Sequence, residues 1–283
     1  YVTCGMQLTL GFSPCPNDTF IFYALLHGKI NTRGLTFLPL PDDVESLNRK
    51  AINNEPDITK ISFAAYLSIQ QNYLLLTAGS ALGNNCGPLL ISKKKIIQEE
   101  MHLHTVAIPG KHTTANFLFD AFFPRHAGKT EMVFSEIESA VLNEITDAGV
   151  IIHENRFTYE KKGLFKVADL GEKWEQSTGQ PIPLGGIAIR RSINHEIAAS
   201  VNELIKQSVI YAFAHPEEAM EYVRQHAQEM DESVMWQHIR LYVNDYTIDL
   251  KEKGKDAIDK FFNHAHKQNL IEEIKRPLFI DEQ

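Results

Sequence analysis

The alternation of strand-like and helix-like segments over the first 70 residues restricts the fold of this chain most strongly. Three β-rich runs each end in residues with turn or capping chemistry, and apolar residues at helical spacing follow each one. The order is typical of a mostly parallel sheet covered by helices. We predict strands at Leu8–Phe12, Leu35–Leu40 and Asp57–Ile61, each followed by a helix, at Thr19–Leu26, Val44–Ala51 and Phe63–Leu67 in turn.

Capping side chains fix where these helices are expected to begin. A side-chain oxygen before a helix accepts hydrogen bonds from first-turn N–H groups, and a glycine often ends the helix. We assign the cap of the first helix to Asn17 or Asp18, with Gly28 as its stop. The cap of the second helix is assigned to Asp42 or Asp43, and that of the third to Ser62.

A second unit of the same kind follows the charged run Lys93–Lys95. It starts with a strand at Thr105–Pro109, turns at Gly110 and enters a helix at Thr113–Asp120. The predicted continuation is Met132–Phe134, an acidic helix at Ile137–Leu142, a strand at Ala148–Ile152 and a return strand at Leu184–Ile189. Helices then dominate. One helix has an apolar stripe of Ile197, Val201, Leu204, Ile205 and Val209, and the next is expected to start at Pro216. The last helix is marked by Ile258, Phe261, Phe262 and Ala265.

We therefore predict an α/β protein with two lobes, two mixed sheets and a central cleft. The first lobe is discontinuous, residues 1–91 and 188–283, and the second is inserted, residues 92–187. Ligands of open α/β sheets bind outside the carboxyl ends of strands, where helix N-termini present free N–H groups. Two helix N-termini that face one cleft favour binding of an organic anion. The chain passes between the lobes only twice, which favours closure of the lobes about a hinge.

Composition and charge exclude several classes of protein. The 28 basic and 36 acidic residues give a net charge of −8, so we expect no nucleic-acid partner. No apolar run approaches the roughly 18 residues of a membrane span, and the visible N-terminus lacks a secretory pattern. Cys4, Cys15 and Cys86 have no metal-ligand spacing, so we expect small buried hydrophobes in a cytoplasmic protein.

Two strand-to-helix corners carry candidate anion-binding groups. The corner Lys60, Ile61, Ser62 supplies a hydroxyl and backbone donors at a helix start, and Thr113 with Thr114 has the same form in the second lobe. The positive end of a helix dipole and a hydroxyl both favour a carboxylate. The alternative is that the hydroxyls only cap helices and that the lysine is a solvated strand end.

His153 is the candidate general base, because it follows the apolar run Gly149–Ile152 at the carboxyl end of a predicted strand. The alternative is a hydrogen-bonded structural histidine. The other histidines lack zinc-ligand spacing, so we expect no metal, and His112 is either a ligand contact or a solvated loop residue. The chain has no GxGxxG, P-loop or G-x-S-x-G motif, which argues against hydride transfer, NTP hydrolysis and an α/β-hydrolase.

Five segments resemble one known family, the 1,4-dihydroxy-6-naphthoate synthases of the futalosine route to menaquinone. They are Gly11–Ala24, Thr59–Ser62, Pro109–Thr114, Ile151–Tyr159 and Pro181–Gly186, and the likeness runs from about Leu8 to Phe279. The resemblance implies the fold of type II periplasmic binding proteins. It also implies a lyase that converts cyclic dehypoxanthinyl futalosine into 1,4-dihydroxy-6-naphthoate and releases dihydroxyacetone.

The resemblance also implies roles for particular residues. His153 matches the family's proton acceptor, while Lys60, Ile61 and Ser62 match one substrate-contact segment and Thr113 with Thr114 the other. It implies a small-molecule carboxylate as partner and no cofactor, and it leaves the oligomeric state open. Two alternatives share the fold: chorismate dehydratase of the same pathway, and a non-catalytic solute-binding protein for an organic anion.

Overall fold

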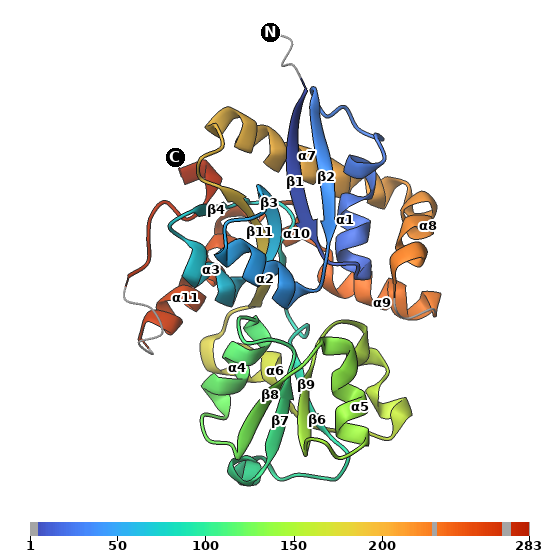
Figure 1. The fold of residues 1–283 in the computed structure, drawn as a ribbon, viewed down its shortest axis with the longest axis vertical. Coiled ribbons are helices and arrows are strands. Elements are labelled where there is room, and N and C mark those ends of the chain that lie inside the picture. Colours follow the sequence, from blue (N-terminus) through green and yellow to red (C-terminus); the bar gives the residue numbers. More distant parts are fainter. Residues whose placement is uncertain (1–4, 228–230, 268–272, 283) are drawn as a thin grey trace.

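Two mixed β-sheets carry the fold in the computed structural model, which describes residues 5–227, 231–267 and 273–282. The first sheet has six strands, in the order β2-β1-β3-β11-β4 with β5 paired to β11. The second sheet has five strands, in the order β10-β6-β9-β7-β8. Figure 1 shows them one above the other, each covered by helices, and each sheet with its helices is called a lobe here. The predicted α/β class with two mixed sheets is confirmed.

The first lobe contains both ends of the described chain. Its strands are β1 (Met6–Phe12), β2 (Leu35–Pro41), β3 (Ile58–Ser62), β4 (Tyr73–Leu75), β5 (Ala81–Gly83) and β11 (Ile182–Arg190). Its helices are α1 (Pro16–Leu26), α2 (Val44–Ile52), α3 (Phe63–Ile69), α7 (His195–Ala214), α8 (Pro216–His226), α9 (Glu232–Tyr242), α10 (Asp245–Ile248) and α11 (Lys251–Lys267).

The second lobe comes from the middle of the chain. Its strands are β6 (Leu89–Ser92), β7 (Thr105–Ile108), β8 (Gly128–Glu131), β9 (Ala148–Ile151) and β10 (Phe165–Asp169). Its helices are α4 (Thr114–Phe122), α5 (Ile137–Leu142) and α6 (Leu170–Thr178).

The N-terminal β-α-β-α-β-α order is as predicted. Strands β1, β2 and β3 run parallel, and β11 joins β3 in the antiparallel direction, which makes the sheet mixed. Apolar residues of β1, α1, α7, α8 and α9 pack into one core on one face of the sheet. The predicted stripe on α7 belongs to that core, with Val201, Leu204, Ile205 and Val209 buried and Ile197 packed at its margin.

The predicted N-terminal cap is correct for α2 and wrong for α1, whereas the predicted stop of α1 is correct, since Gly28 follows the C-cap with a left-handed φ of +63°. At α2, one carboxylate oxygen of Asp43 accepts hydrogen bonds from the backbone N–H groups of Glu45 and Ser46. Helix α1 begins earlier, at Pro16, with Cys15 in the cap position and no side-chain cap. Proline suits a first turn because it has no N–H to satisfy, and this leaves the Asp18 carboxylate for other partners. Ser62 occupies the cap position of α3 without making the cap bond.

The strand pairing differs from the two chain boundaries predicted for the lobes. The chain was expected to change lobe after residue 91 and to return at residue 188, but these points fall inside β6 and β11. Strand β6 pairs with β9 and β10, whereas β11 pairs with β3, β4 and β5 from Ile182 onward. The run Lys93–Lys95 is exposed and follows β6, so its charged side chains are solvated and do not mark a crossing between the lobes. The division into independent domains stays a prediction.

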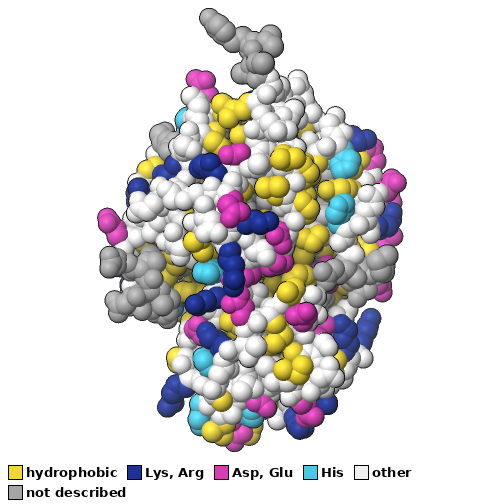
Figure 2. Space-filling model, in the orientation of Figure 1, with side chains coloured by type: hydrophobic (Ala, Val, Ile, Leu, Met, Phe, Trp, Pro, Cys, Tyr) yellow, Lys and Arg dark blue, Asp and Glu magenta, His cyan; other side chains and the backbone are white. Residues whose placement is uncertain are grey.

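Other local predictions also differ from the structure. Met132–Phe134 was expected to continue the strand–helix alternation, but the strand is β8, which ends at Glu131. The side chains of β8 are mostly exposed, so its sequence lacks the apolar pattern that would have identified it. Cys15 and Cys86 are buried free thiols as expected, while Cys4 lies outside the described residues. No helix among the described residues has the length and apolar character needed to span a membrane. Acidic and basic side chains are intermixed on the face drawn in Figure 2.

The Asp43 cap offers a test of the α2 assignment. We expect Asp43→Ala to lower the free energy of unfolding by about 1 kcal/mol, because two first-turn N–H groups lose their acceptor. Asp256→Ala, at an exposed position within α11, should change it by less than about 0.5 kcal/mol. Urea unfolding measures both, and equal values for the two variants would contradict the cap.

Candidate active site

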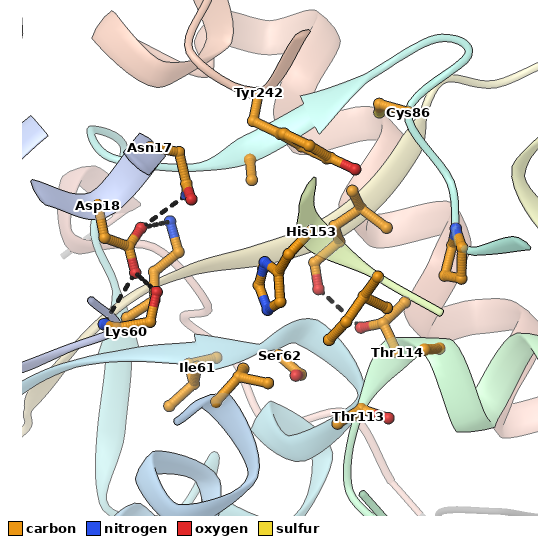
Figure 3. Close-up of a pocket in the computed structure, with 18 of the residues that line it drawn as sticks. Asn17, Asp18, Lys60, Ile61, Ser62, Cys86, Thr113, Thr114, His153 and Tyr242 are labelled. Carbon is orange, nitrogen blue, oxygen red and sulfur yellow. Dashed lines mark hydrogen bonds and ion pairs between the residues drawn. The ribbon is translucent and has the colours of Figure 1, made fainter. Parts of the chain in front are cut away.

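One pocket between the lobes collects all the residues predicted from the sequence. Its empty volume, including space open to solvent, is about 680 Å³. Residues of both lobes line it, from the β1–α1, β3–α3 and β7–α4 corners, the end of β9, and α9. Lys60, Ile61, Ser62, Thr113, Thr114 and His153 are all among them (Figure 3). The structure thus brings the six together, and their roles stay predictions.

The Asp18 carboxylate is the most heavily bonded group of the pocket wall. It is buried, and it accepts hydrogen bonds from the backbone N–H and the hydroxyl of Ser13 and from the side-chain amide of Asn17. The Lys60 ammonium lies 3.1 Å from Oδ1, the oxygen that also accepts from Asn17, while both Ser13 bonds go to Oδ2. A buried charge needs such partners, because transfer out of water without them is very costly.

Lys60 is therefore neither a solvated strand end nor a free cation for a ligand. Its side chain is buried, and its ammonium group also donates to the carbonyl of Gly79 at 2.9 Å. Lys60 and Asp18 together form a nearly neutral, desolvated unit on one side of the pocket.

The Ser62 corner keeps one free donor. Asn48 donates its side-chain amide to the Ser62 hydroxyl oxygen and accepts from the Ser62 backbone N–H, at 3.1 and 2.9 Å. The hydroxyl hydrogen of Ser62 is not used by these two bonds, so it can point to a ligand. Ile61 adds an apolar wall between Lys60 and Ser62.

The Thr113–Thr114 corner presents backbone rather than hydroxyl groups. The Thr113 hydroxyl donates to the carbonyl of Gly110 and accepts from the N–H of Asn116, so it caps α4. The Thr114 hydroxyl donates to Leu184 in the first lobe and accepts from the N–H of Ala64. Since both hydroxyls are engaged, the donors that this corner leaves for a ligand are first-turn N–H groups of α4, and anion binding there stays a prediction.

His153 stands at the carboxyl end of β9 with a left-handed backbone, φ +57°. This conformation is uncommon for a residue with a side chain and often marks functional positions. Figure 3 shows its ring between the Asn17–Asp18–Lys60 group and the Thr113–Thr114 corner. Its Nε2 atom is buried and has no hydrogen-bond partner among the described residues.

The environment of His153 keeps its imidazole neutral. Burial lowers the pKa of His153 to about 4, and the negative charge of Asp18 opposes this shift while the positive charge of Lys60 adds to it. At neutral pH the ring therefore has an unprotonated nitrogen that can accept a proton. Phe134 contacts it edge-on, with ring centres 4.9 Å apart.

Cys15, His153 and Glu154 form a group whose donor atoms lie within 4.8 Å of one another, and these residue types can hold a metal ion. The Cys15 thiol does not favour this, because metals bind the thiolate. Burial raises the pKa of Cys15 well above its usual value, and Glu154 and Asp18 raise it further. The three residues are therefore a poor metal site.

A charged contact joins the lobes beside the pocket. Glu45 of α2 accepts from the backbone N–H of His112 at 3.0 Å and from its Nδ1 at 2.7 Å. A Cβ at Gly110, where φ is +149°, would lie 2.5 Å from this carboxylate, so the glycine permits the approach. His112 is thus a bridge between lobes rather than a ligand contact or a solvated loop residue.

Comparison with known proteins identifies the family. A family model described as menaquinone biosynthesis matches residues 8–267, nearly the whole chain. The chain belongs to this menaquinone biosynthesis family. The resemblance drawn from the sequence is thereby confirmed.

Several known proteins are similar to this chain over almost their full length. The 1,4-dihydroxy-6-naphthoate synthase of Thermus thermophilus is 42% identical over 96% of this chain and 99% of its own. The enzyme of that name from Streptomyces coelicolor is 40% identical over 93% and 94%. A crystal structure from Archaeoglobus fulgidus has a TM-score of 0.89 and 35% identity, covering 94% of this chain and 98% of that one.

More distant structures confirm the fold alone. The periplasmic aliphatic sulphonate-binding protein of Escherichia coli has a TM-score of 0.65 at 10% identity, covering 94% of this chain and 89% of that one. The predicted periplasmic-binding-protein-like architecture is therefore correct for this member of the menaquinone biosynthesis family.

Sequence reasoning missed several polar residues of the pocket. Asn17 and Asp18 were interpreted as helix caps, and His238 of α9 was given no role. A signal for His238 was present: it lies with Val234, Met235, Ile239 and Tyr242 on one apolar helical stripe, where a histidine must be buried. The sequence alone does not show that this stripe faces the pocket.

The Asp18–Lys60 pair gives a test of this geometry. We expect Lys60→Met to lower the free energy of unfolding by about 3 kcal/mol, because Asp18 stays buried without its cation. Adding Asp18→Asn should restore much of the loss. Lys206→Met breaks a half-exposed pair with Asp249 and should change the value by less than about 1 kcal/mol. Urea unfolding of the three variants measures this, and additive losses in the double variant would contradict the pairing.

Proposed function

We propose that the protein converts cyclic dehypoxanthinyl futalosine into 1,4-dihydroxy-6-naphthoate and dihydroxyacetone, with His153 as general base. The observation that carries the proposal is the Nε2 atom of the neutral His153 ring, which lies in the interlobe pocket and has no hydrogen-bond partner in the described part of the chain. The family and the 42% identity to a synthase of that name support the substrate class. Because both curated relatives have the synthase name, the related dehydratase is not proposed.

The carboxylate of the substrate has a suitable place at the α4 corner. Free N–H groups at the start of a helix and the positive end of its dipole stabilise an anion. The Ser62 hydroxyl faces the same pocket from the other lobe and can donate a further hydrogen bond. Lys60 takes part through its backbone and its position, since its charge is balanced by Asp18.

The proposed chemistry needs one proton acceptor. His153 Nε2 removes the proton of a substrate hydroxyl, and the O–H electron pair forms a carbonyl bond. The carbonyl forms on the ring carbon, and the carbon–carbon bond between this carbon and the three-carbon fragment breaks. The electron pair of that bond goes to the fragment, which leaves as an enolate and takes the proton back from His153. The ring dione that remains becomes the aromatic diol by shifting two protons. The imidazolium that forms is stabilised by the negative charge of Asp18. This step is redox neutral and needs no cofactor.

The surroundings of the pocket suit this step. Ile61, Ile152, Leu184 and Tyr242 give it apolar walls. Exclusion of water strengthens hydrogen bonds to the charged substrate and limits side reactions of an electron-rich intermediate. A biosynthetic activity of this kind also favours the cytoplasm as the location of the protein.

Replacement of the base should separate catalysis from binding. We expect His153→Ala to lower kcat by about 100-fold or more, the usual scale of general-base assistance. The affinity for 1,4-dihydroxy-6-naphthoate should change by less than about threefold, which is under 1 kcal/mol, because its carboxylate is held at the α4 corner. Turnover assays and calorimetry measure the two effects.

The control is His264→Ala, on α11 outside the pocket lining. It should leave both turnover and product affinity unchanged. A well-folded His153→Ala protein with normal turnover would remove His153 from the proposed role.

The lowered pKa of His153 also predicts the acid limit of activity. A base is lost when it is protonated, so activity falls as the pH drops through its pKa. Because burial lowers that pKa to about 4, kcat/KM should show no histidine-dependent decline between pH 7 and about 5. Steady-state assays at each pH, with folding checked by circular dichroism, measure this. A decline centred near pH 6.5 that disappears in His153→Ala would contradict the assignment.

A further inference from the structure

A second histidine nitrogen in the pocket lacks a partner. His238 of α9 lines the pocket and is fully buried. Its Nδ1 atom, like Nε2 of His153, has no hydrogen-bond partner among the described residues. The two rings are stacked with centres 6.0 Å apart. Buried polar atoms without partners cost free energy and need an explanation, of which a bound ligand is one.

The hydrogen bonds around Asn17 fix the state of His238. A carboxylate only accepts hydrogen bonds, so the Asn17 atom 2.8 Å from Asp18 is the amide nitrogen. The amide oxygen of Asn17 then faces Nε2 of His238 at 2.9 Å and must accept from it. His238 Nε2 therefore has the hydrogen of the neutral ring, and Nδ1 has a lone pair.

The surroundings of Nδ1 support this state. Burial lowers the pKa of His238 well below its usual value, and the nearby His153 lowers it further, so the ring stays neutral. The Glu154 carboxylate lies on the same side of the ring, with an oxygen 3.9 Å from Nδ1, outside hydrogen-bond distance. Nδ1 is thus a hydrogen-bond acceptor of fixed orientation with no donor among the described residues.

The position of this acceptor indicates which part of a ligand it meets. His238 is bonded to Asn17, and Figure 3 places Asn17 and Asp18 on the side of His153 away from Thr113 and Thr114. A ligand whose carboxylate sits at the α4 corner would extend past His153 toward this side. In the proposed substrate, the part that reaches there bears hydroxyl groups, which are hydrogen-bond donors.

We infer that His238 Nδ1 accepts a hydrogen bond from a hydroxyl of the three-carbon fragment that is later released. This contact orients the fragment so that the hydroxyl on the adjoining ring carbon meets His153 Nε2. The hydrogen bonds from His238 to Asn17 and from Asn17 to Asp18 hold His238 in the tautomer whose Nδ1 is an acceptor. The inference rests on the proposed function for the identity of the substrate.

Two substitutions separate this role from a purely structural one. In asparagine the side-chain oxygen is attached to Cγ, as Nδ1 is in histidine, so His238→Asn keeps an acceptor at the δ position. The glutamine side chain reaches one bond further, so His238→Gln keeps a partner for Asn17 but offers no δ acceptor. We expect kcat/KM to fall about tenfold in His238→Gln, the value of one hydrogen bond, and by less than about threefold in His238→Asn.

Product binding provides the matched control. The naphthoate product no longer contains the three-carbon fragment, so its affinity should change by less than about twofold in both variants, under 0.5 kcal/mol. The reverse order, with His238→Gln active and His238→Asn impaired, would show that His238 only supports Asn17. Equal losses in the two variants would also overturn the inference.

The tautomer can be tested without turnover. Nitrogen-15 NMR of histidine-labelled protein should show His238 protonated at Nε2 and unprotonated at Nδ1 at pH 7. A proton on Nδ1 would overturn the inference even if wild-type protein turns the substrate over. Absence of wild-type turnover would instead contradict the proposed function, and the tautomer measurement would still decide the state of His238.

Discussion

The buried Asp18 carboxylate is the interaction on which the site depends. It lies at the start of α1, yet its partners come from the end of β1, from α1 and from β3. Through Lys60 it neutralises a second buried charge, and through Asn17 it orients His238 on α9. Its field also acts on His153, where it partly offsets the effect of burial on the pKa. One desolvated charge thus acts on His153 through its field and on His238 through the hydrogen bonds of Asn17.

The second requirement is that the lobes meet around the pocket. Glu45 of α2 holds His112, and Thr114 bonds to Leu184 and Ala64 across the junction. On another side, Phe261 of α11 packs against Phe117 of α4 and Trp174 of α6. These contacts hold the second-lobe corner and His153 against the first-lobe wall, so the candidate residues of both lobes line one pocket in this conformation. Hinge closure on ligand stays a prediction.

The sequence predicted the fold well where local patterns and tertiary structure agree. The alternation of β1 to α3 and the apolar stripe of α7 are periodic features that packing preserves. It failed where a polar residue had two possible uses: Asp18 has the chemistry of a cap, but Pro16 starts the helix and frees the carboxylate. The role of His238 could not be predicted, because its partner Asn17 lies 221 residues away in the chain.

We propose that one interlobe pocket binds a carboxylate at the α4 corner and presents the other end of the ligand to His153 and His238. A crystal structure with 1,4-dihydroxy-6-naphthoate tests it most directly. We predict the carboxylate within hydrogen-bond distance of the first-turn N–H groups of α4 and the Ser62 hydroxyl, with a ring hydroxyl directed toward His153. A product carboxylate bound beside Lys60 and Asp18, or a product bound outside the pocket, would contradict the account.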